Sequence, residues 1–174
     1  AGKVEAHDCR KLAGMEEDSE YDEHVKAAIA WHRNSNGIVT FCWHWRVPKD
    51  MSGNKEDTAF YTQSDKYPDG TTFDITRAVL SGTDENKLIL QHIDNIAGQL
   101  RRLKLAGIPV LFRPLHEASG GWFWWGAKGS SAYKKLWNIL YDRLENYHKL
   151  TNLIWVWNGQ NSSWLVDEDK YDIA

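Results

Sequence analysis

The sequence of 174 residues is poor in cysteine and proline, and neither sign of charge predominates. Its 2 cysteines, Cys9 and Cys42, are too few for a disulfide framework, and the sequence leaves open whether they pair. A formal net charge of −3 predicts no surface for nucleic acid. No run of about 18 apolar residues occurs, so no membrane span is expected. No signal peptide is recognised, and a removed signal or a truncated start would each explain why Ala1 opens within folded-looking sequence.

Motifs for nucleotides and metals are missing as well. Gly120-Gly121 is not a Gly-x-Gly-x-x-Gly fingerprint and no P-loop is present, which disfavours a nucleotide site. The 7 histidines are scattered without ligand spacing, and no second histidine stands four residues after His116. We therefore expect no metal site and no cofactor.

Aromatic residues are abundant, with 10 Trp and 7 Tyr in a composition that is 42% hydrophobic and 26% charged. This length and composition suit one ordinary domain with a sizeable core. The aromatic excess fits carbohydrate or protein recognition, and it equally fits a densely packed core.

Helical and strand patterns alternate along the chain. Apolar residues recur at helical spacing over residues 20–35, 84–106 and about 131–147, the last helix being capped by Ser130 or Ser131. Short apolar runs predict strands at residues 37–43, 108–115 and 152–157, and residues 171–174 resemble the start of another. The polar stretch 46–83 is long for a connection, and such loops are usually functional.

Continuous apolar strands between helices are typical of a parallel sheet covered on both faces, either a barrel or an open doubly wound sheet. Polar and aromatic residues follow several different strands, at His44-Trp45, His116-Glu117 and Asn158-Gly159. Active sites of (β/α)8 barrels are built in this way from the carboxyl ends of several strands. The pattern therefore favours a (β/α)8 TIM barrel.

The segment Arg113–Gly126 carries the strongest functional signal, because a His-Glu pair ends a strand and is followed by two glycines and three tryptophans. Glu117 is the candidate general acid/base: a carboxyl walled by tryptophan loses solvation, which favours its protonated form. Carboxylate chemistry beside flat aromatic surfaces suits an enzyme that acts on sugar rings. The alternative is a Trp-rich loop packed on the core, with a solvated Glu117.

Strand alternation predicts which side chains share the barrel mouth. If residues 111–117 remain extended, Arg113 and Glu117 point to the same face. An inward arginine needs a carboxylate or a polar ligand, because an unpaired buried charge is costly. The alternatives are a structural ion pair for Arg113 and an ordinary strand-end histidine at His116.

The same alternation places other polar and aromatic side chains. His44 falls on the face of Thr40 and Cys42 and is expected at the mouth, as is Asn158 on its own strand. Trp122 follows two glycines that can present its indole to a sugar face. Six further tryptophans are expected to pack in the core, in loops or against helices: Trp43, Trp45, Trp124, Trp125, Trp155 and Trp157.

Four segments resemble glycoside hydrolase family 26, which consists mostly of endo-β-1,4-mannanases on a (β/α)8 barrel. They are Gly37–Trp45, Val110–Glu117, Gly120–Gly126 and Asn152–Trp157. The resemblance covers most of the chain, and the His-Glu pair with the following Gly-Gly-Trp-Phe-Trp-Trp-Gly is its most specific part.

The resemblance implies retaining hydrolysis by two glutamates, without a cofactor. Glu117 matches the acid/base, and His116 matches the neighbour that helps to orient the catalytic carboxylates. Arg113, His44 and Trp122 match positions that line the substrate cleft beside the scissile bond. The substrate implied is a β-mannan or a related polysaccharide, and the location implied is extracellular.

In the family the nucleophile glutamate follows the seventh strand, whereas residues 1–174 correspond to about strands 2 to 6 of a single catalytic barrel. The nucleophile and the rest of the barrel are therefore expected in another segment or chain; Glu145, Asp167 and Glu168 do not match it. The alternatives are a β-glucanase or β-xylanase of the same family, a non-catalytic carbohydrate-binding protein, and a structural domain whose tryptophans only form a core.

Overall fold

The computed structural model describes residues 5–8 and 19–174, with side chains from residue 23 onward. Cys9, whose pairing with Cys42 the sequence leaves open, lies outside the described residues. Among the described residues, no helix combines the length and apolar character that crossing a membrane requires.

Four parallel strands form the main sheet, in the order β1–β2–β5–β6. They are β1 (Glu5–Asp8), β2 (Val39–Trp43), β5 (Val110–Pro114) and β6 (Leu153–Trp155). Val39 pairs with Val110, and Val110 pairs with Leu153. Beyond β6, Val156 forms a parallel bridge with Ile173, where the sequence predicted the start of another strand. Because every neighbour in the sheet follows in chain order and runs parallel, the arrangement is that of part of an α/β barrel.

The predicted helices are present with nearly the predicted bounds. They are α1 (Ser19–Ser35), α3 (Asp84–Leu105) and α4 (Ser130–Tyr141), which continues as a π-helix, η3 (Asp142–Tyr147). Thr83 caps α3, because its side chain accepts a hydrogen bond from the backbone N–H of Asn86. The cap predicted for α4 is wrong: Gly129 occupies that position without a side-chain hydrogen bond, and Ser130 is already helical.

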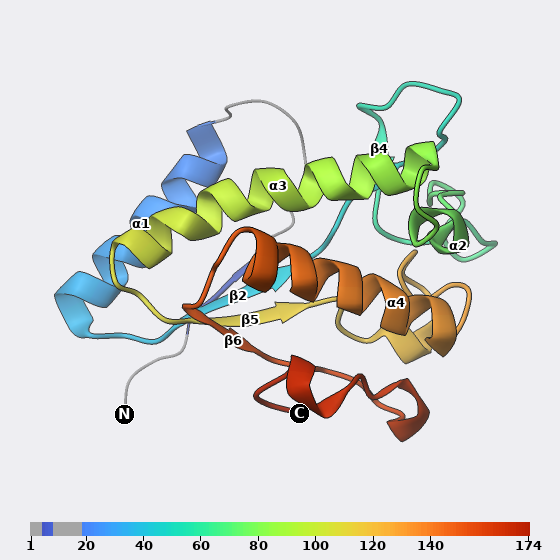
Figure 1. Cartoon of the computed structure of the whole chain (residues 1–174). Coiled ribbons are helices and arrows are strands. Elements are labelled where there is room, and N and C mark those ends of the chain that lie inside the picture. The colour runs from blue at the N-terminus through green and yellow to red at the C-terminus, as the bar shows by residue number, and fades with distance from the viewer. Residues whose placement is uncertain (1–4, 9–18) are drawn as a thin grey trace.

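These helices lie on one side of the sheet (Figure 1). Helices on one face fit the barrel that the sequence favoured over an open doubly wound sheet. In a barrel the strands turn their second face to an interior that side chains fill.

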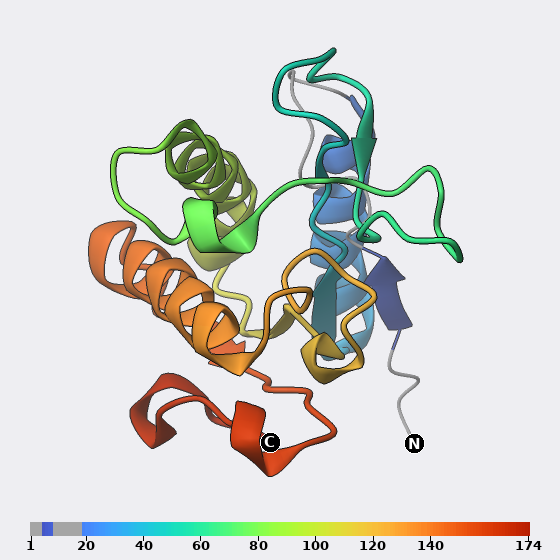
Figure 2. The ribbon, with the colours of Figure 1, turned by 90° about the vertical axis from the view of Figure 1, so that its right-hand side faces the viewer.

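The segments that follow the strands gather at one end of the sheet. In Figure 1 the strands point to the right, and the segments after β2 and β5 lie at that end. Figure 2 faces this end, with residues 46–74 and 115–129 toward the viewer. The long stretch after β2 contains a small antiparallel pair, β3 (Val47–Pro48) with β4 (Thr58–Ala59), and a single helical turn, α2 (Ile75–Ala78).

Tryptophan forms much of the core, as the sequence predicted. Trp43 and Trp45 stack with ring centroids 4.1 Å apart, and both are fully buried. Trp155 packs against Trp137 of α4 and against Phe112 of β5. Aromatic pairs of this kind contribute about 0.5–1.5 kcal/mol beyond the area they bury. These aromatic contacts join β2, β5 and β6 to the buried core and to α4.

Candidate active site

The chain leaves β5 by a sharp turn, and this corrects the expectation that residues 111–117 stay extended. The strand ends at Pro114, and Leu115 (φ 50°) and Glu117 (φ 55°) both adopt the left-handed conformation. Leu115 is fully buried, so it does not share the open face with Arg113. Such conformations are costly for residues other than glycine, and they cluster at functional sites.

A backbone hydrogen bond holds Glu117 in this turn. Its N–H donates to the carbonyl oxygen of Asn158, at 3.0 Å, from the segment that follows β6. The Glu117 side chain is half-buried. The carboxyl group is thus placed by the ends of two neighbouring strands.

Arg113 and Asn158 meet, as expected of two residues at the barrel mouth. Nη1 of Arg113 donates to Oδ1 of Asn158 at 2.7 Å, and Nη2 lies 3.5 Å from Sγ of Cys42. Asn158 therefore contacts two residues of the site: its side chain binds Arg113 and its backbone carbonyl binds Glu117. The guanidinium has a polar partner, which offsets the cost of its partial burial.

His116 is buried and its ring is held on several sides. Burial, followed by the positive charges of His44 and Arg113, lowers its pKa from 6.5 to about 3. The ring packs against Phe123, and the His116 carbonyl accepts a hydrogen bond of 2.9 Å from Nε1 of Trp125. His116 is consequently a neutral imidazole at neutral pH, able to donate from one ring nitrogen and accept at the other.

His44 reaches the same place from the end of β2. Its ring meets the His116 ring edge to face, with centroids 4.6 Å apart, and it also contacts Phe60 and Phe123. Sγ of Cys42 lies 3.3 Å from Nδ1 of His116. The sequence analysis missed the cluster of Cys42, His44 and His116, because its members come from the ends of two strands that are distant in the sequence. The only sequence feature that pointed to it was the two-residue spacing of Cys42 and His44, which places both side chains on one face at the end of β2.

Trp122 is half-buried at the edge of this site, while Trp124 and Trp125 are fully buried, as predicted. The ring of Trp122 folds over Gly120 and occupies the space where a Cβ would stand. Gly121 adopts φ 72°, a conformation that favours glycine. Gly120 thus leaves room for the indole of Trp122, and Gly121 allows the backbone conformation that precedes it.

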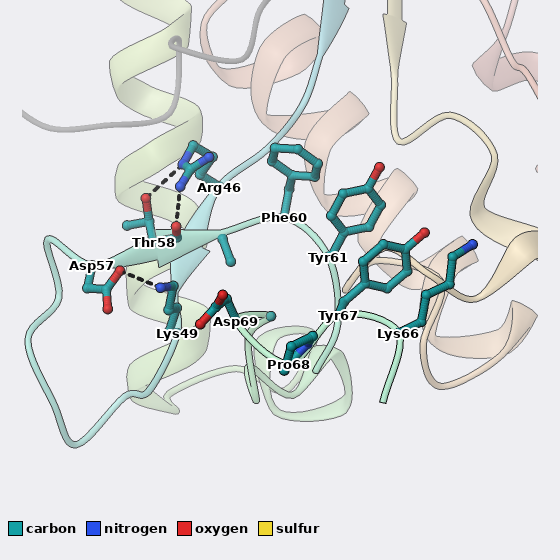
Figure 3. A pocket seen from close by; sticks show the side chains of 12 residues that line it. Arg46, Lys49, Asp57, Thr58, Phe60, Tyr61, Lys66, Tyr67, Pro68 and Asp69 are labelled. Atoms are coloured by element: carbon teal, nitrogen blue, oxygen red, sulfur yellow. Dashed lines mark hydrogen bonds and ion pairs between the residues drawn. The ribbon is translucent and has the colours of Figure 1, made fainter. Parts of the chain in front are cut away.

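A pocket of about 450 Å³ adjoins the site and is formed by the stretch after β2, from Arg46 to Gly70 (Figure 3). The guanidinium of Arg46 donates to the side chain and the carbonyl of Thr58, and Lys49 pairs with Asp57 at 3.0 Å. Tyr61 stacks on Tyr67 at 4.0 Å. The pocket wall is continuous with the site, because Tyr61 also stacks on Phe123 and Phe60 contacts His44.

Comparison with known proteins agrees with the sequence resemblance. The profile of glycosyl hydrolase family 26 matches residues 5–173. The chain is 49% identical over 154 residues to a mannan endo-1,4-beta-mannosidase of Thermothelomyces thermophilus, covering 86% of this chain and 30% of that protein. It is 37% identical over 132 residues to a mannan endo-1,4-beta-mannosidase of Bacillus subtilis (strain 168), covering 71% and 36% of the two chains.

Solved structures show the same fold. A beta-mannanase from a symbiotic protist of the termite Reticulitermes speratus, complexed with gluco-manno-oligosaccharide, superposes with a TM-score of 0.84 at 40% identity, covering 95% of this chain and 52% of that one. A GH26-CBM35 beta-(1,4)-mannanase of Podospora anserina gives a TM-score of 0.76 at 43% identity, covering 95% and 37%. The chain spans about a third of the length of the two curated relatives and about half or less of these two structures.

Proposed function

The chain belongs to glycosyl hydrolase family 26, and from this membership we propose that the complete protein hydrolyses β-1,4-mannosidic bonds in mannan-type polysaccharides with retention of configuration. Residues 1–174 form part of its single catalytic barrel, and no cofactor takes part. The observation that supports the proposal is the position of Glu117, whose backbone N–H bonds to Asn158, the residue whose side chain also binds Arg113.

Glu117 is the general acid/base in this proposal. It protonates the glycosidic oxygen as the bond to the leaving sugar breaks, while a second glutamate attacks the anomeric carbon and forms a covalent glycosyl-enzyme. Glu117 then takes a proton from the water that releases the sugar. The two carboxyls of a retaining enzyme stand about 5–5.5 Å apart. The nucleophile is proposed to come from the part of the family fold that this chain does not span.

The neighbouring side chains orient the reactants. Neutral His116 can hydrogen-bond either to a catalytic carboxyl or to a sugar hydroxyl without adding a charge. Arg113 and Asn158 present a fixed donor and acceptor to the sugar at the cleavage point. His44 lines the cleft beside them, and the half-buried indole of Trp122 offers an apolar face for a sugar ring.

The substrate is a β-mannan or a glucomannan, and the protein is proposed to act outside the cell. These two points rest on the relatives, whose names specify mannan and, in one complex, a gluco-manno-oligosaccharide. No nucleic acid or membrane partner is proposed.

Substitution of Glu117 in the complete protein tests the proposal. Glu117→Gln should lower kcat for mannan by about 10²–10⁴-fold, which is the usual contribution of a positioned general acid/base. The exposed Glu168 provides a matched control, and Glu168→Gln should retain wild-type kcat. Unchanged hydrolysis by Glu117→Gln would refute the assignment, provided that both variants melt as the wild type does.

A further inference from the structure

Three side chains with metal-ligating atoms converge where β2 and β5 end. Sγ of Cys42 and one ring nitrogen each of His44 and His116 lie within 4.8 Å of one another. In a tetrahedral zinc site, Zn–S bonds of about 2.3 Å and Zn–N bonds of about 2.0–2.1 Å place neighbouring ligand atoms about 3.3–3.6 Å apart. Sγ of Cys42 and Nδ1 of His116 already stand 3.3 Å apart. His44 supplies the third ligand atom, which lies within 4.8 Å of the other two.

The fold brings these side chains together and holds two of them in place. Cys42 pairs in register with Arg113 of β5, and strand alternation carries His44 to the face of Cys42. His116 lies within the turn that follows β5, between Leu115 and Glu117. Cys42 and His116 are 6% and 3% exposed, and Trp125 and Phe123 wall the His116 ring. Little side-chain entropy remains to be lost when a cation binds them.

The donor set selects a class of cation. One thiolate and two imidazoles suit zinc and copper, whereas calcium and magnesium require oxygen ligands. Three protein ligands leave the fourth position of a tetrahedral ion open to water or to a sugar hydroxyl. Arg113 limits the affinity: its Nη2, 3.5 Å from Sγ of Cys42, stabilises the thiolate but repels a cation. This balance suits an ion that binds reversibly when it is supplied, not a resident cofactor.

We propose that Cys42, His44 and His116 form a reversible binding site for a thiophilic divalent cation of the Zn²⁺ type, and that its occupation inhibits hydrolysis. The inhibitory half rests on the proposed function, since it requires His44 and His116 to serve the reaction. A bound cation would engage the imidazoles of His44 and His116, so that neither could hydrogen-bond to the substrate or to a catalytic carboxyl. It would also place a positive charge beside Arg113, on the residue that directly precedes Glu117.

Co²⁺ serves as the spectroscopic probe, with the complete protein under reducing conditions. A thiolate bound to Co²⁺ gives a ligand-to-metal charge-transfer band, and tetrahedral Co²⁺ gives intense visible bands. The wild type should show both bands, saturating at one equivalent, and Zn²⁺ should displace the Co²⁺. Cys42→Ser should abolish the charge-transfer band and weaken binding of Zn²⁺ at least tenfold.

Cys9→Ser is the matched control, because Cys9 is the other cysteine of this sequence, and it should leave the band intact. His44→Gln guards against a folding defect in Cys42→Ser; it should weaken binding of Zn²⁺ at least tenfold and retain the wild-type melting temperature. Absence of the band in the wild type, or its survival in Cys42→Ser, would overturn the site.

Activity measurements separate the two halves of the proposal. Zn²⁺ should inhibit mannan hydrolysis with the same half-saturation at which it displaces Co²⁺, and a chelator should restore the rate. Zn²⁺ that binds at this site without slowing hydrolysis would overturn the inhibitory half. A wild-type protein that does not hydrolyse mannan at all would refute the proposed function, while the Co²⁺ spectra would still decide the metal site.

Discussion

The backbone N–H of Glu117 donates a hydrogen bond of 3.0 Å to the carbonyl oxygen of Asn158, and this bond joins two strand ends that lie 41 residues apart in the sequence. The side chain of the same asparagine accepts a hydrogen bond from Arg113. Asn158 thereby links the candidate acid/base, Glu117, to the guanidinium of Arg113. Its side chain can be altered without removing the backbone bond.

Asn158→Ala should therefore lower kcat/KM for mannan without moving the turn that carries Glu117. The change leaves the Arg113 guanidinium without its amide partner, and a hydrogen bond to a charged group is typically worth about 1.5–3 kcal/mol. We expect a loss of about tenfold to a hundredfold in kcat/KM, measured on soluble mannan. Asn161, an exposed asparagine of the same segment, provides the control, since Asn161→Ala should leave kcat/KM within about twofold. A wild-type value for Asn158→Ala would show that the Arg113 contact is dispensable.

Trp122→Ala should raise KM for mannan more than it lowers kcat, because a stacking surface binds the substrate in its ground state as well as in the transition state. The expected rise is about threefold to tenfold, on the scale of aromatic contacts worth about 0.5–1.5 kcal/mol. Trp122→Phe should recover most of the affinity. Tyr147→Ala, which removes an aromatic ring that is 67% exposed on η3, should leave KM unchanged. An unchanged KM in Trp122→Ala would exclude the indole as a sugar platform.

Gly120→Ala should reproduce part of the Trp122 defect. The new Cβ would overlap the Trp122 ring, so the indole must move from its position. Gly98→Ala is the matched control, because a Cβ at Gly98 meets nothing within 4 Å and this glycine lies within α3. The control should leave KM unchanged and stabilise the helix by about 0.5–1 kcal/mol. Equal KM values for the two alanine variants would contradict the role given to Gly120.

His92 should make the protein less stable in acid. Burial lowers its pKa from 6.5 to about 4, and its Nδ1 accepts a hydrogen bond of 3.1 Å from Nε1 of Trp45. Between pH 6.5 and about pH 4, His92 binds a proton in the unfolded chain but not in the folded one. Stability is therefore fully present above pH 6.5 and falls as the pH approaches 4, by about 3 kcal/mol at most.

His92→Gln tests this pH dependence by denaturant unfolding between pH 7 and pH 4. Glutamine keeps an acceptor for Trp45 but does not titrate. As the pH falls from 7 to 4, the unfolding free energy of the variant should therefore decrease less than that of the wild type. A difference that does not vary with pH would show that His92 is not the group responsible.

Strand alternation accounts for much of what the sequence predicted correctly. Trp43 and Trp45 face the packed side of β2, and Cys42 and His44 face the site, as a period of two requires. Arg113 and Asn158 were placed at the mouth by the same rule, and they meet. The rule succeeds where the backbone remains extended and each residue has one possible face.

The same rule fails where the backbone leaves the strand. Leu115 and Glu117 adopt positive φ, which propensity does not predict for a leucine and a glutamate. The tertiary bond from Glu117 to Asn158 accompanies this conformation, and local sequence does not reveal it. Contacts between strands are equally hidden: Cys42 and His116 are 74 residues apart in the sequence, so spacing gave no sign of their proximity.

The role of Glu117 as proton donor is tested most directly by how the rate of Glu117→Ala depends on the leaving group. An aryl β-mannoside with an activated leaving group needs no proton to depart, whereas the sugar leaving group of mannan does. The formation rate of the glycosyl-enzyme should fall by about 10²–10⁴-fold for mannan, and it should remain near the wild-type value for the aryl substrate. Equal losses on the two substrates, or no loss on mannan, would contradict the assignment of Glu117 as the general acid.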